Sequence, residues 1–136
     1  MVDLCQLFKK QMNKHKCVLC LGTNFEKYTS IQNAREQLSQ LFPNIRFSEE
    51  MITEAIGQHL LSPFINQIGI FSTELSAKEI TEKCKNIEHF LGRKPEYKSQ
   101  GIVKIDIDLL SFDQLILKPK DMERDFVLKG IQNLQS

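Results

Sequence analysis

The chain has 136 residues, of which 41% are hydrophobic and 26% are charged, and its formal net charge at pH 7 is +1. This length is enough for one domain with its own core, and the composition is that of a folded globular protein. The near-neutral charge provides no overall attraction to nucleic acid or to an anionic membrane, so neither partner is expected. Without an apolar run of roughly 18 residues or a signal-peptide pattern, a cytoplasmic protein is expected, as a monomer or a weak homodimer.

We expect one domain over residues 1–136, in which a lead-in helix over 1–15 precedes the main domain over 16–136. Apolar residues among lysines in the first segment indicate an amphipathic helix that packs against the domain or a partner. The apolar run from Cys17 to Leu21 predicts a buried central strand, and Gly22-Thr23-Asn24 predicts the tight turn that ends it.

Apolar residues at helical spacing from Ile31 to Leu41 predict the first helix, which Phe42-Pro43-Asn44 ends. Residues 45–53 mix polar and apolar side chains in a second expected strand. Residues 54–63 are expected to form a long loop, and strand character resumes over 64–73.

Ser76 and Glu79 form a capping-box pattern at the start of a second helix, which Gly92 is expected to end. A polar, basic loop over 93–101 leads to an alternating strand over 103–112, and a terminal helix follows. The βαββαβ order predicts an α+β, ferredoxin-like sandwich: a mostly antiparallel sheet with helices on one face.

The four cysteines are scattered along the chain and are expected to be reduced, buried hydrophobic residues. Cys17 and Cys20 form a C-x-x-C string, but both lie in the predicted central strand. Side chains three residues apart on a strand point to opposite faces, which argues against a shared metal or redox site.

Two carboxylates share one face of the strand that follows the basic loop. In Ile105-Asp106-Ile107-Asp108-Leu109 the alternation directs the apolar side chains to the core and both aspartates to the other face, with about 7 Å between their Cα atoms. One interpretation is a half-solvated strand with a polar outer face. The other is a magnesium site, because Mg²⁺ commonly binds one or two carboxylates and completes its shell with water and substrate phosphates.

Other side chains are candidates for binding a phosphorylated substrate. Arg93 and Lys104 belong to a basic stretch that either contacts phosphate or is simply solvated. Gly22 permits close backbone approach to a ligand, although most such strings are simple turns. Asn66 offers a paired donor and acceptor to a heterocycle, and the neighbouring Phe64 has a ring that can stack, but a strand-end asparagine is more often a structural residue.

In this order and spacing, the motifs resemble those of 6-hydroxymethyl-7,8-dihydropterin pyrophosphokinases, over roughly residues 17–128. The matching features are a Leu-Gly-x-Asn turn, an aromatic residue before an asparagine, a glutamate and a Gly-Arg pair at the end of the second helix, an Asp-x-Asp pair and a Glu-Arg-x-Phe-Val-Leu stretch. In this sequence the matching residues are, in the same order, Leu21–Asn24, Phe64–Asn66, Glu88 with Gly92-Arg93, Asp106–Asp108 and Glu123–Leu128.

The resemblance implies transfer of diphosphate from ATP to a pterin alcohol in folate biosynthesis. Asp106 and Asp108 would bind two Mg²⁺ ions together with ATP, and the implied catalytic cations are Arg93, Lys104 and Arg124. Asn66 would hydrogen-bond the pterin beside Phe64. The remaining implied substrate-binding residues are Thr53, Gly57, Glu88 and Phe126.

The chain departs from the family pattern at two cationic positions. Gln100-Gly101-Ile102-Val103 stands where an aromatic residue and an arginine are usual, and Leu117-Lys118 replaces Pro-His. Lys104 is the nearest replacement cation, but lysine does not reproduce the bidentate clamp of arginine. Each loss predicts a rate lower by about 10²-fold or more if those groups stabilise the transition state.

Two alternatives to an efficient enzyme stay open. The first is a diverged module of the same fold that binds a pterin or a nucleotide with little or no turnover, which the replaced cations favour. The second is a plain ferredoxin-like interaction domain whose N-terminal segment recruits a partner; such a domain would not be stabilised by nucleotide and magnesium.

Overall fold

The fold is described from a computed structural model, over residues 3–5, 14–54 and 63–135. The expected lead-in helix over 1–15 and the expected loop over 54–63 lie largely outside the described residues, and so does Gly57, an implied substrate-binding residue. None of the described helices is both long and apolar enough to cross a membrane.

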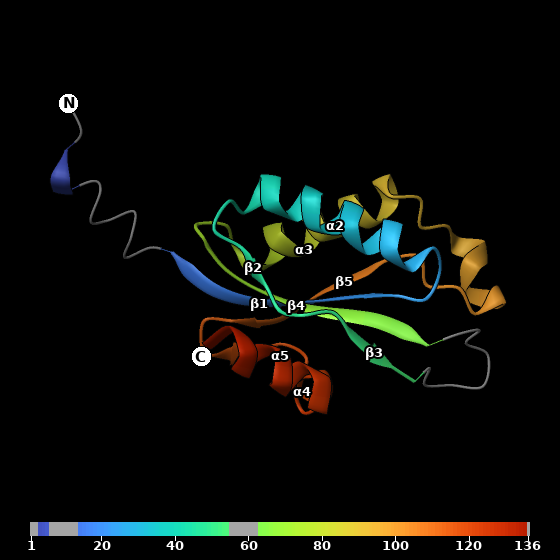
Figure 1. Ribbon diagram of the computed structural model, residues 1–136. Helices are drawn as coiled ribbons and strands as arrows, with labels where there is room; N and C mark the ends of the chain where they lie inside the picture. Colours follow the sequence, from blue (N-terminus) through green and yellow to red (C-terminus); the bar gives the residue numbers. More distant parts are fainter. Residues whose placement is uncertain (1–2, 6–13, 55–62, 136) are drawn as a thin grey trace.

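A single antiparallel sheet in the order β2-β4-β1-β5-β6 organises the fold, and β3 also pairs with β4 (Figure 1). The α+β, ferredoxin-like prediction is confirmed, and the apolar run from Cys17 lies in the central strand β1, between β4 and β5. The elements are β1 (His15–Thr23), α2 (Lys27–Leu41), β2 (Arg46–Phe47), β3 (Met51–Thr53), β4 (Phe64–Thr73), α3 (Ala77–Phe90), η1 (Pro95–Gln100), β5 (Asp106–Phe112), β6 (Leu115–Ile116), α4 (Pro119–Met122) and α5 (Asp125–Gln135).

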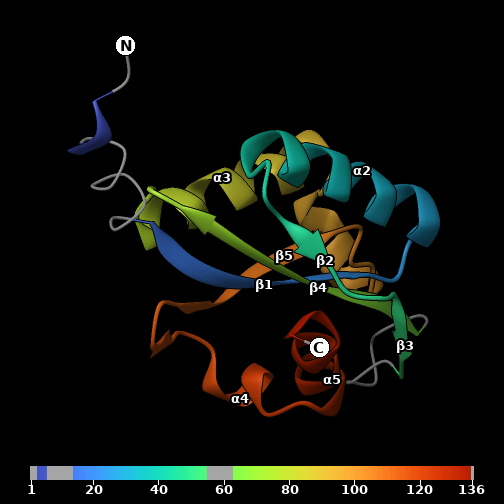
Figure 2. The same ribbon diagram turned by 60° about the vertical axis from the view of Figure 1, so that its left-hand side comes forward.

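Helices cover both faces of the sheet. The two helices of the βαββαβ series, α2 and α3, lie on one face, and the C-terminal α4 and α5 lie on the other (Figures 1 and 2). Alternating residues of β1 divide accordingly: Cys17, Leu19 and Leu21 belong to the larger core under α2 and α3, whereas Cys20 packs in the smaller core under α5. The second helical layer, absent from the predicted arrangement, therefore covers the sheet face that carries Asp106 and Asp108.

The cysteine prediction holds for three residues of four. Cys17 and Cys84 are buried and Cys20 is partly buried, and burial raises the pKa of each of these thiols to about 12. Cys5 is exposed, contrary to the expectation, because it lies in the N-terminal segment that precedes β1.

The second helix begins where the capping-box pattern predicts. The Glu79 backbone N–H donates to the Ser76 hydroxyl at 3.2 Å, and the Glu79 carboxylate accepts from the Ser76 backbone N–H at 3.2 Å. Gly92 follows the helix with φ of 99°, in the left-handed region that glycine adopts without strain. Two of the predicted site residues, Glu88 and Arg93, lie at this end of α3.

Two strand predictions need correction. The single strand expected over 45–53 is two short strands, because the Ser48 hydroxyl accepts the Ile68 backbone N–H at 3.0 Å and interrupts the ladder. The strand expected from Val103 begins only at Asp106, because the backbone of residues 101–104 bonds to the side chains of Thr23, the last residue of β1, and Asn24. The expected loop over 93–101 also contains the 3-10 helix η1.

Candidate functional site

The two aspartates lie in register with polar and small residues of the neighbouring strands. Gly22 of β1 pairs with Asn66 on one side and with Asp106 on the other, and Cys20 pairs with Asp108. Side chains directly opposite each other on antiparallel strands point to the same face of the sheet. Asn66 and the aspartates therefore share the face that α5 covers.

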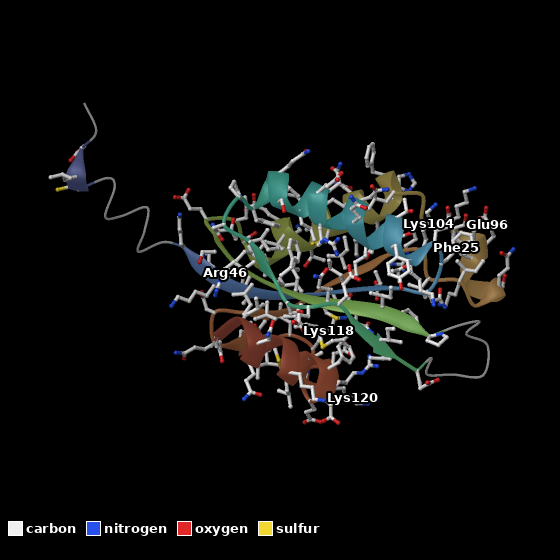
Figure 3. The ribbon with its side chains drawn as sticks, viewed as in Figure 1. Phe25, Arg46, Glu96, Lys104, Lys118 and Lys120 are labelled. Atoms are coloured by element: carbon white, nitrogen blue, oxygen red, sulfur yellow. The ribbon has the colours of Figure 1, made fainter. Side chains whose placement is uncertain are left out.

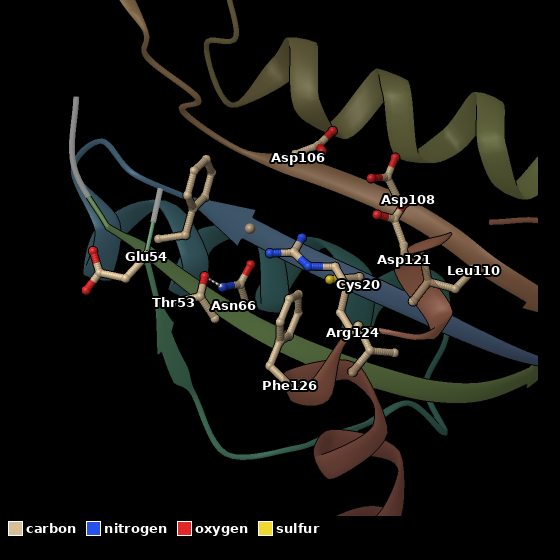
Figure 4. A pocket seen from close by; sticks show the side chains of 13 residues that line it. Cys20, Thr53, Glu54, Asn66, Asp106, Asp108, Leu110, Asp121, Arg124 and Phe126 are labelled. Atoms are coloured by element: carbon tan, nitrogen blue, oxygen red, sulfur yellow. Dashed lines mark hydrogen bonds between the residues drawn. The ribbon is translucent and has the colours of Figure 1, made fainter. Parts of the chain in front are cut away.

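A cavity of about 240 Å³, here called the central cavity, opens on this face between the sheet and α5 (Figure 4). It brings together segments from both halves of the chain. Of the predicted site residues, those that line it are Thr53, Phe64, Asn66, Asp106, Asp108, Arg124 and Phe126. The central cavity is thus lined by an amide at one end, two carboxylates at the other, and aromatic rings and a guanidinium between them.

Gly22 keeps the floor of the cavity open. A Cβ atom at this position would lie 3.1 Å from Oδ1 of Asn66 and 3.7 Å from the Phe64 ring. The first distance is tighter than ordinary van der Waals contact, so a larger residue would displace the amide. The structure places Gly22 against Asn66 and Phe64, and the close approach of its backbone to a ligand stays a prediction.

Asn66 is held in a fixed orientation at one end of the cavity. It is only 5% exposed, and its Nδ2 donates to the Thr53 hydroxyl at 2.6 Å (Figure 4). A buried amide with one side-chain partner already in place presents its remaining donor and acceptor in defined directions. Such an arrangement suits recognition of the edge of a heterocycle.

Arg124 and Phe126 enter the cavity from the C-terminal helical layer. The Arg124 guanidinium carbon lies 4.5 Å from the centre of the Phe126 ring, close enough for a cation–π contact. Figure 4 shows the Arg124 side chain extending into the middle of the cavity, between Asn66 and the aspartates. This cation can meet an anionic group bound near the aspartates, and the rings of Phe64 and Phe126 provide apolar surface for a flat ligand.

Asp106 and Asp108 form an electrostatically strained pair. Burial, and then the neighbouring charge of Asp106, raises the pKa of Asp108 to about 7, although the Lys118 ammonium lowers it. A carboxyl group that resists ionisation beside another carboxylate is stabilised in its charged form by a cation. The pair is therefore a suitable binding site for a hard divalent ion.

Arg93 connects the aspartate pair to a buried glutamate. Its guanidinium lies 3.0 Å from Oε1 of Glu88 and 3.1 Å from Oδ1 of Asp106. Glu88 also accepts the backbone N–H of Ile107 at 2.7 Å, and burial raises its pKa while that bond and Arg93 oppose the shift. Glu88 thus fixes both the start of β5 and the position of Arg93.

A second groove, of about 530 Å³, lies on the other side of β5 between α3 and the β6–α4 segment. Asp106 and Asp108 line it as well as the central cavity, together with Glu88, Arg93 and Lys118. The carboxylate pair therefore lies between the central cavity and the second groove.

Lys104 is the predicted catalytic residue that the structure places apart from the others. Its Nζ lies 3.2 Å from Glu26 and 5.9 Å from the centre of the Phe25 ring, and it lines neither the central cavity nor the second groove. Its catalytic role stays a prediction.

Several residues of the two spaces were missed from the sequence. Cys20 was assigned to the apolar interior of β1, although its alternation with Gly22 places it on the cavity face. Asp121 also lines the cavity, and no periodic pattern marks it because it lies in the four-residue helix α4. Lys118 was noted only as a replaced histidine, yet it lines the second groove beside Asp108.

Comparison with known protein families agrees with this geometry. The model of the family described as 7,8-dihydro-6-hydroxymethylpterin-pyrophosphokinase (HPPK) matches residues 18–136, most of the chain. The chain belongs to the HPPK family. HPPK proteins are ATP-dependent pyrophosphokinases, transferases of folate biosynthesis whose substrates are ATP and a pterin. A comparison with curated proteins found no significant match.

The donor set of the site fits Mg²⁺, which HPPK proteins generally use. Asp106 and Asp108 supply hard oxygen donors, and within residues 3–5, 14–54 and 63–135 no group of three carboxylate, thiol or imidazole side chains converges on a metal position. Magnesium commonly uses one or two carboxylates and takes its other ligands from water and phosphates. We therefore expect the ion to bind tightly only together with a nucleotide.

The raised pKa of Asp108 predicts how stability depends on pH. A carboxyl whose folded pKa, about 7, exceeds its ordinary value of 3.8 contributes stability below pH 4 that is lost as the pH rises through 7. Relative to an Asp108→Asn variant, ligand-free wild type should lose about 1 to 2 kcal/mol between pH 4 and pH 8, a value reduced for partial exposure of the carboxyl. Denaturant unfolding of both proteins at the two pH values measures this difference. An equal change in unfolding free energy for wild type and Asp108→Asn would contradict the prediction.

Proposed function

We propose that this HPPK protein transfers diphosphate from ATP to 6-hydroxymethyl-7,8-dihydropterin, with two Mg²⁺ ions held between Asp106, Asp108 and the ATP phosphates. The observation that carries the proposal is the carboxylate pair shared by two adjoining spaces. One space has the amide and the aromatic rings that suit a pterin. The other has Arg93 and Lys118 beside the carboxylates, which suits a triphosphate.

In the central cavity the protein would bind and orient the acceptor. Asn66, fixed by Thr53, would hydrogen-bond the edge of the pterin, and Phe64 and Phe126 would contact its faces. With the ring so placed, the hydroxymethyl group would point toward Asp106 and Asp108 at the opposite end. Holding the two reacting groups in line supplies much of the rate enhancement in such transfers.

In the second groove the protein would bind the donor and compensate its charge. Arg93 and Lys118 flank the carboxylate pair there, and Arg124 reaches the same region from the central cavity. These three cations would stabilise negative charge on the transferred group and on the departing AMP. Asp106 and Asp108 would hold the magnesium, which would supply Lewis-acid polarisation of the phosphate groups and partly neutralise their negative charge.

The alternative within the same family is a protein that binds its ligands but turns over slowly. Lys104, the nearest replacement for the missing loop arginine, is paired with Glu26 rather than directed to the cavity. Under this alternative, both ligands would bind with ordinary affinity while little AMP forms.

The experiment that tests the proposal combines the protein with ATP, Mg²⁺ and 6-hydroxymethyl-7,8-dihydropterin and follows AMP and the pterin diphosphate. Stoichiometric formation of both products, which stops when EDTA is added, would support the enzyme. Binding of the pterin without AMP release would support the alternative. Failure to bind either substrate would contradict both.

A further inference from the structure

The end of β1 and the turn after it bind the loop that precedes β5 through side-chain hydrogen bonds. Thr23 and Asn24 are buried, at 0% and 6% exposure, although both are polar. The Thr23 hydroxyl donates to the Lys104 carbonyl at 2.6 Å. The Asn24 side chain makes a matched pair of bonds, since its Nδ2 donates to the Gly101 carbonyl at 3.0 Å and its Oδ1 accepts the Val103 N–H at 2.7 Å.

The next two residues of the turn also face this loop. Phe25 contacts the ring of Tyr97 with 5.8 Å between centroids, and the Glu26 carboxylate pairs with Lys104, which Figure 3 shows beside Phe25. Glu26 has φ of 49°, a left-handed conformation that residues other than glycine rarely adopt, and its side chain does not cap the helix it precedes. Residues 23–26, here called the clasp, are therefore shaped by their contacts with the loop.

Beyond the end of the β1–β5 pairing, side chains of the clasp supply the hydrogen bonds that a neighbouring strand would otherwise supply. Strand β5 begins at Asp106, whose partner on β1 is Gly22, so residues 101–104 lie beyond the regular pairing. Their backbone is held by the clasp side chains and by the bond from the Asn24 N–H to the Val103 carbonyl, at 2.9 Å. Asp106 is the second residue after this held segment, which therefore leads the chain directly into the start of β5.

We propose that Asn24 is a positioning residue for the metal-binding carboxylates: by holding residues 101–103 it sets the place of Asp106 between the two substrate spaces. Asn24 lines neither the central cavity nor the second groove, so it acts through the loop rather than on a ligand. The inference rests on the proposed function, because it requires Asp106 to bind a magnesium-bound nucleotide. The pterin end of the cavity is formed by β3, β4 and α5. Thr23 pairs with Ile65 of β4 through its backbone, whereas the Thr23 and Asn24 side chains bond to residues 101–104, so changes to these side chains act on the loop.

The test separates the two substrates. Binding of Mg²⁺ with α,β-methylene-ATP and binding of the pterin are measured by calorimetry for wild type, Asn24→Ala and Thr23→Val. Both variants should bind the magnesium nucleotide at least about tenfold more weakly and the pterin within about twofold of wild type, since a displaced metal ligand costs much while a remote pocket is unchanged. Thr23→Val keeps the shape of the side chain, so it remains informative if Asn24→Ala folds poorly.

Asn44 provides the matched control. Its Nδ2 donates to the Ser72 carbonyl at 2.9 Å and its Oδ1 accepts the Ser72 N–H at 2.8 Å, so it too forms one donor and one acceptor bond to the backbone, at an exposed place that lines neither space. Asn44→Ala should leave both affinities unchanged. The inference would be wrong, and the proposed function unaffected, if both Asn24→Ala and Thr23→Val bound the nucleotide as wild type does. The same holds if nucleotide and pterin affinities fell equally in these variants. A wild-type protein that binds neither probe would overturn the proposed function and the inference with it.

Discussion

Replacement of Asp106 or Asp108 by asparagine is expected to lower the rate of AMP release by at least about 10³-fold while pterin binding stays within about twofold of wild type. The amide keeps the size of the side chain but removes the charged oxygen donor that Mg²⁺ requires. Steady-state assays of AMP release and titration with the pterin measure the two quantities separately.

The Asp108→Asn variant should also be more stable than wild type above pH 7 when no ligand is present, because it removes one of two repelling carboxylates. Lost activity with increased stability is the pattern of a functional residue and not of a structural one. Asp113→Asn is the matched control: Asp113 is exposed, directly follows the same strand and lines neither the central cavity nor the second groove. Asparagine tolerates its φ of 54°. Substantial AMP release by Asp106→Asn and Asp108→Asn would exclude the proposed metal site.

Arg93→Ala is expected to lower kcat by about 10²-fold or more and to destabilise the protein by about 2 kcal/mol. The rate falls because the guanidinium that faces the proposed triphosphate groove is lost. The stability falls because Glu88, which is only 8% exposed, loses its charged partner. AMP release at saturating substrates and denaturant unfolding measure the two effects.

The Arg93→Ala/Glu88→Gln double variant separates these two roles. A neutral glutamine amide can still accept the Ile107 N–H through its oxygen, and it needs no cation beside it. Stability should therefore recover most of the loss seen in Arg93→Ala, whereas kcat should stay low. Recovery of kcat together with stability would show that Arg93 acts only by supporting Glu88, and a direct role on phosphate would be wrong.

Much of the fold was predictable because local patterns and long-range packing agree. The capping box at Ser76 and Glu79 begins α3 as expected, and Ile105, Ile107 and Leu109 are buried on the face opposite the aspartates. Strand alternation fixes which side chains share a face whatever the rest of the chain does. The arrangement of Asp106 and Asp108 on one face therefore followed from the five-residue segment 105–109 alone.

The cavity around these aspartates did not follow from any single segment. It requires Asn66 of β4, Gly22 of β1 and Asp106 of β5 to lie in one row, and strand register is set by the packing of the whole sheet. It also requires α5 on the second face, where Gly130 lets the helix approach so closely that a Cβ atom there would overlap the Ile68 side chain. The hydrophobic periodicity of α5 does not indicate which face of the sheet the helix covers.

The sequence by itself determined the order of the longer helices and strands, the face on which the aspartates lie and, by its motifs, the family. The tertiary structure alone decided that Asn24 holds the loop before β5, that Lys104 pairs with Glu26, and that the aspartates stand between two spaces. The physical reason is sequence separation. Periodicity and capping act over a few residues. The Asn24 and Lys104 contacts join residues about eighty positions apart in the sequence, and such residues lie close together only when the complete sheet has formed.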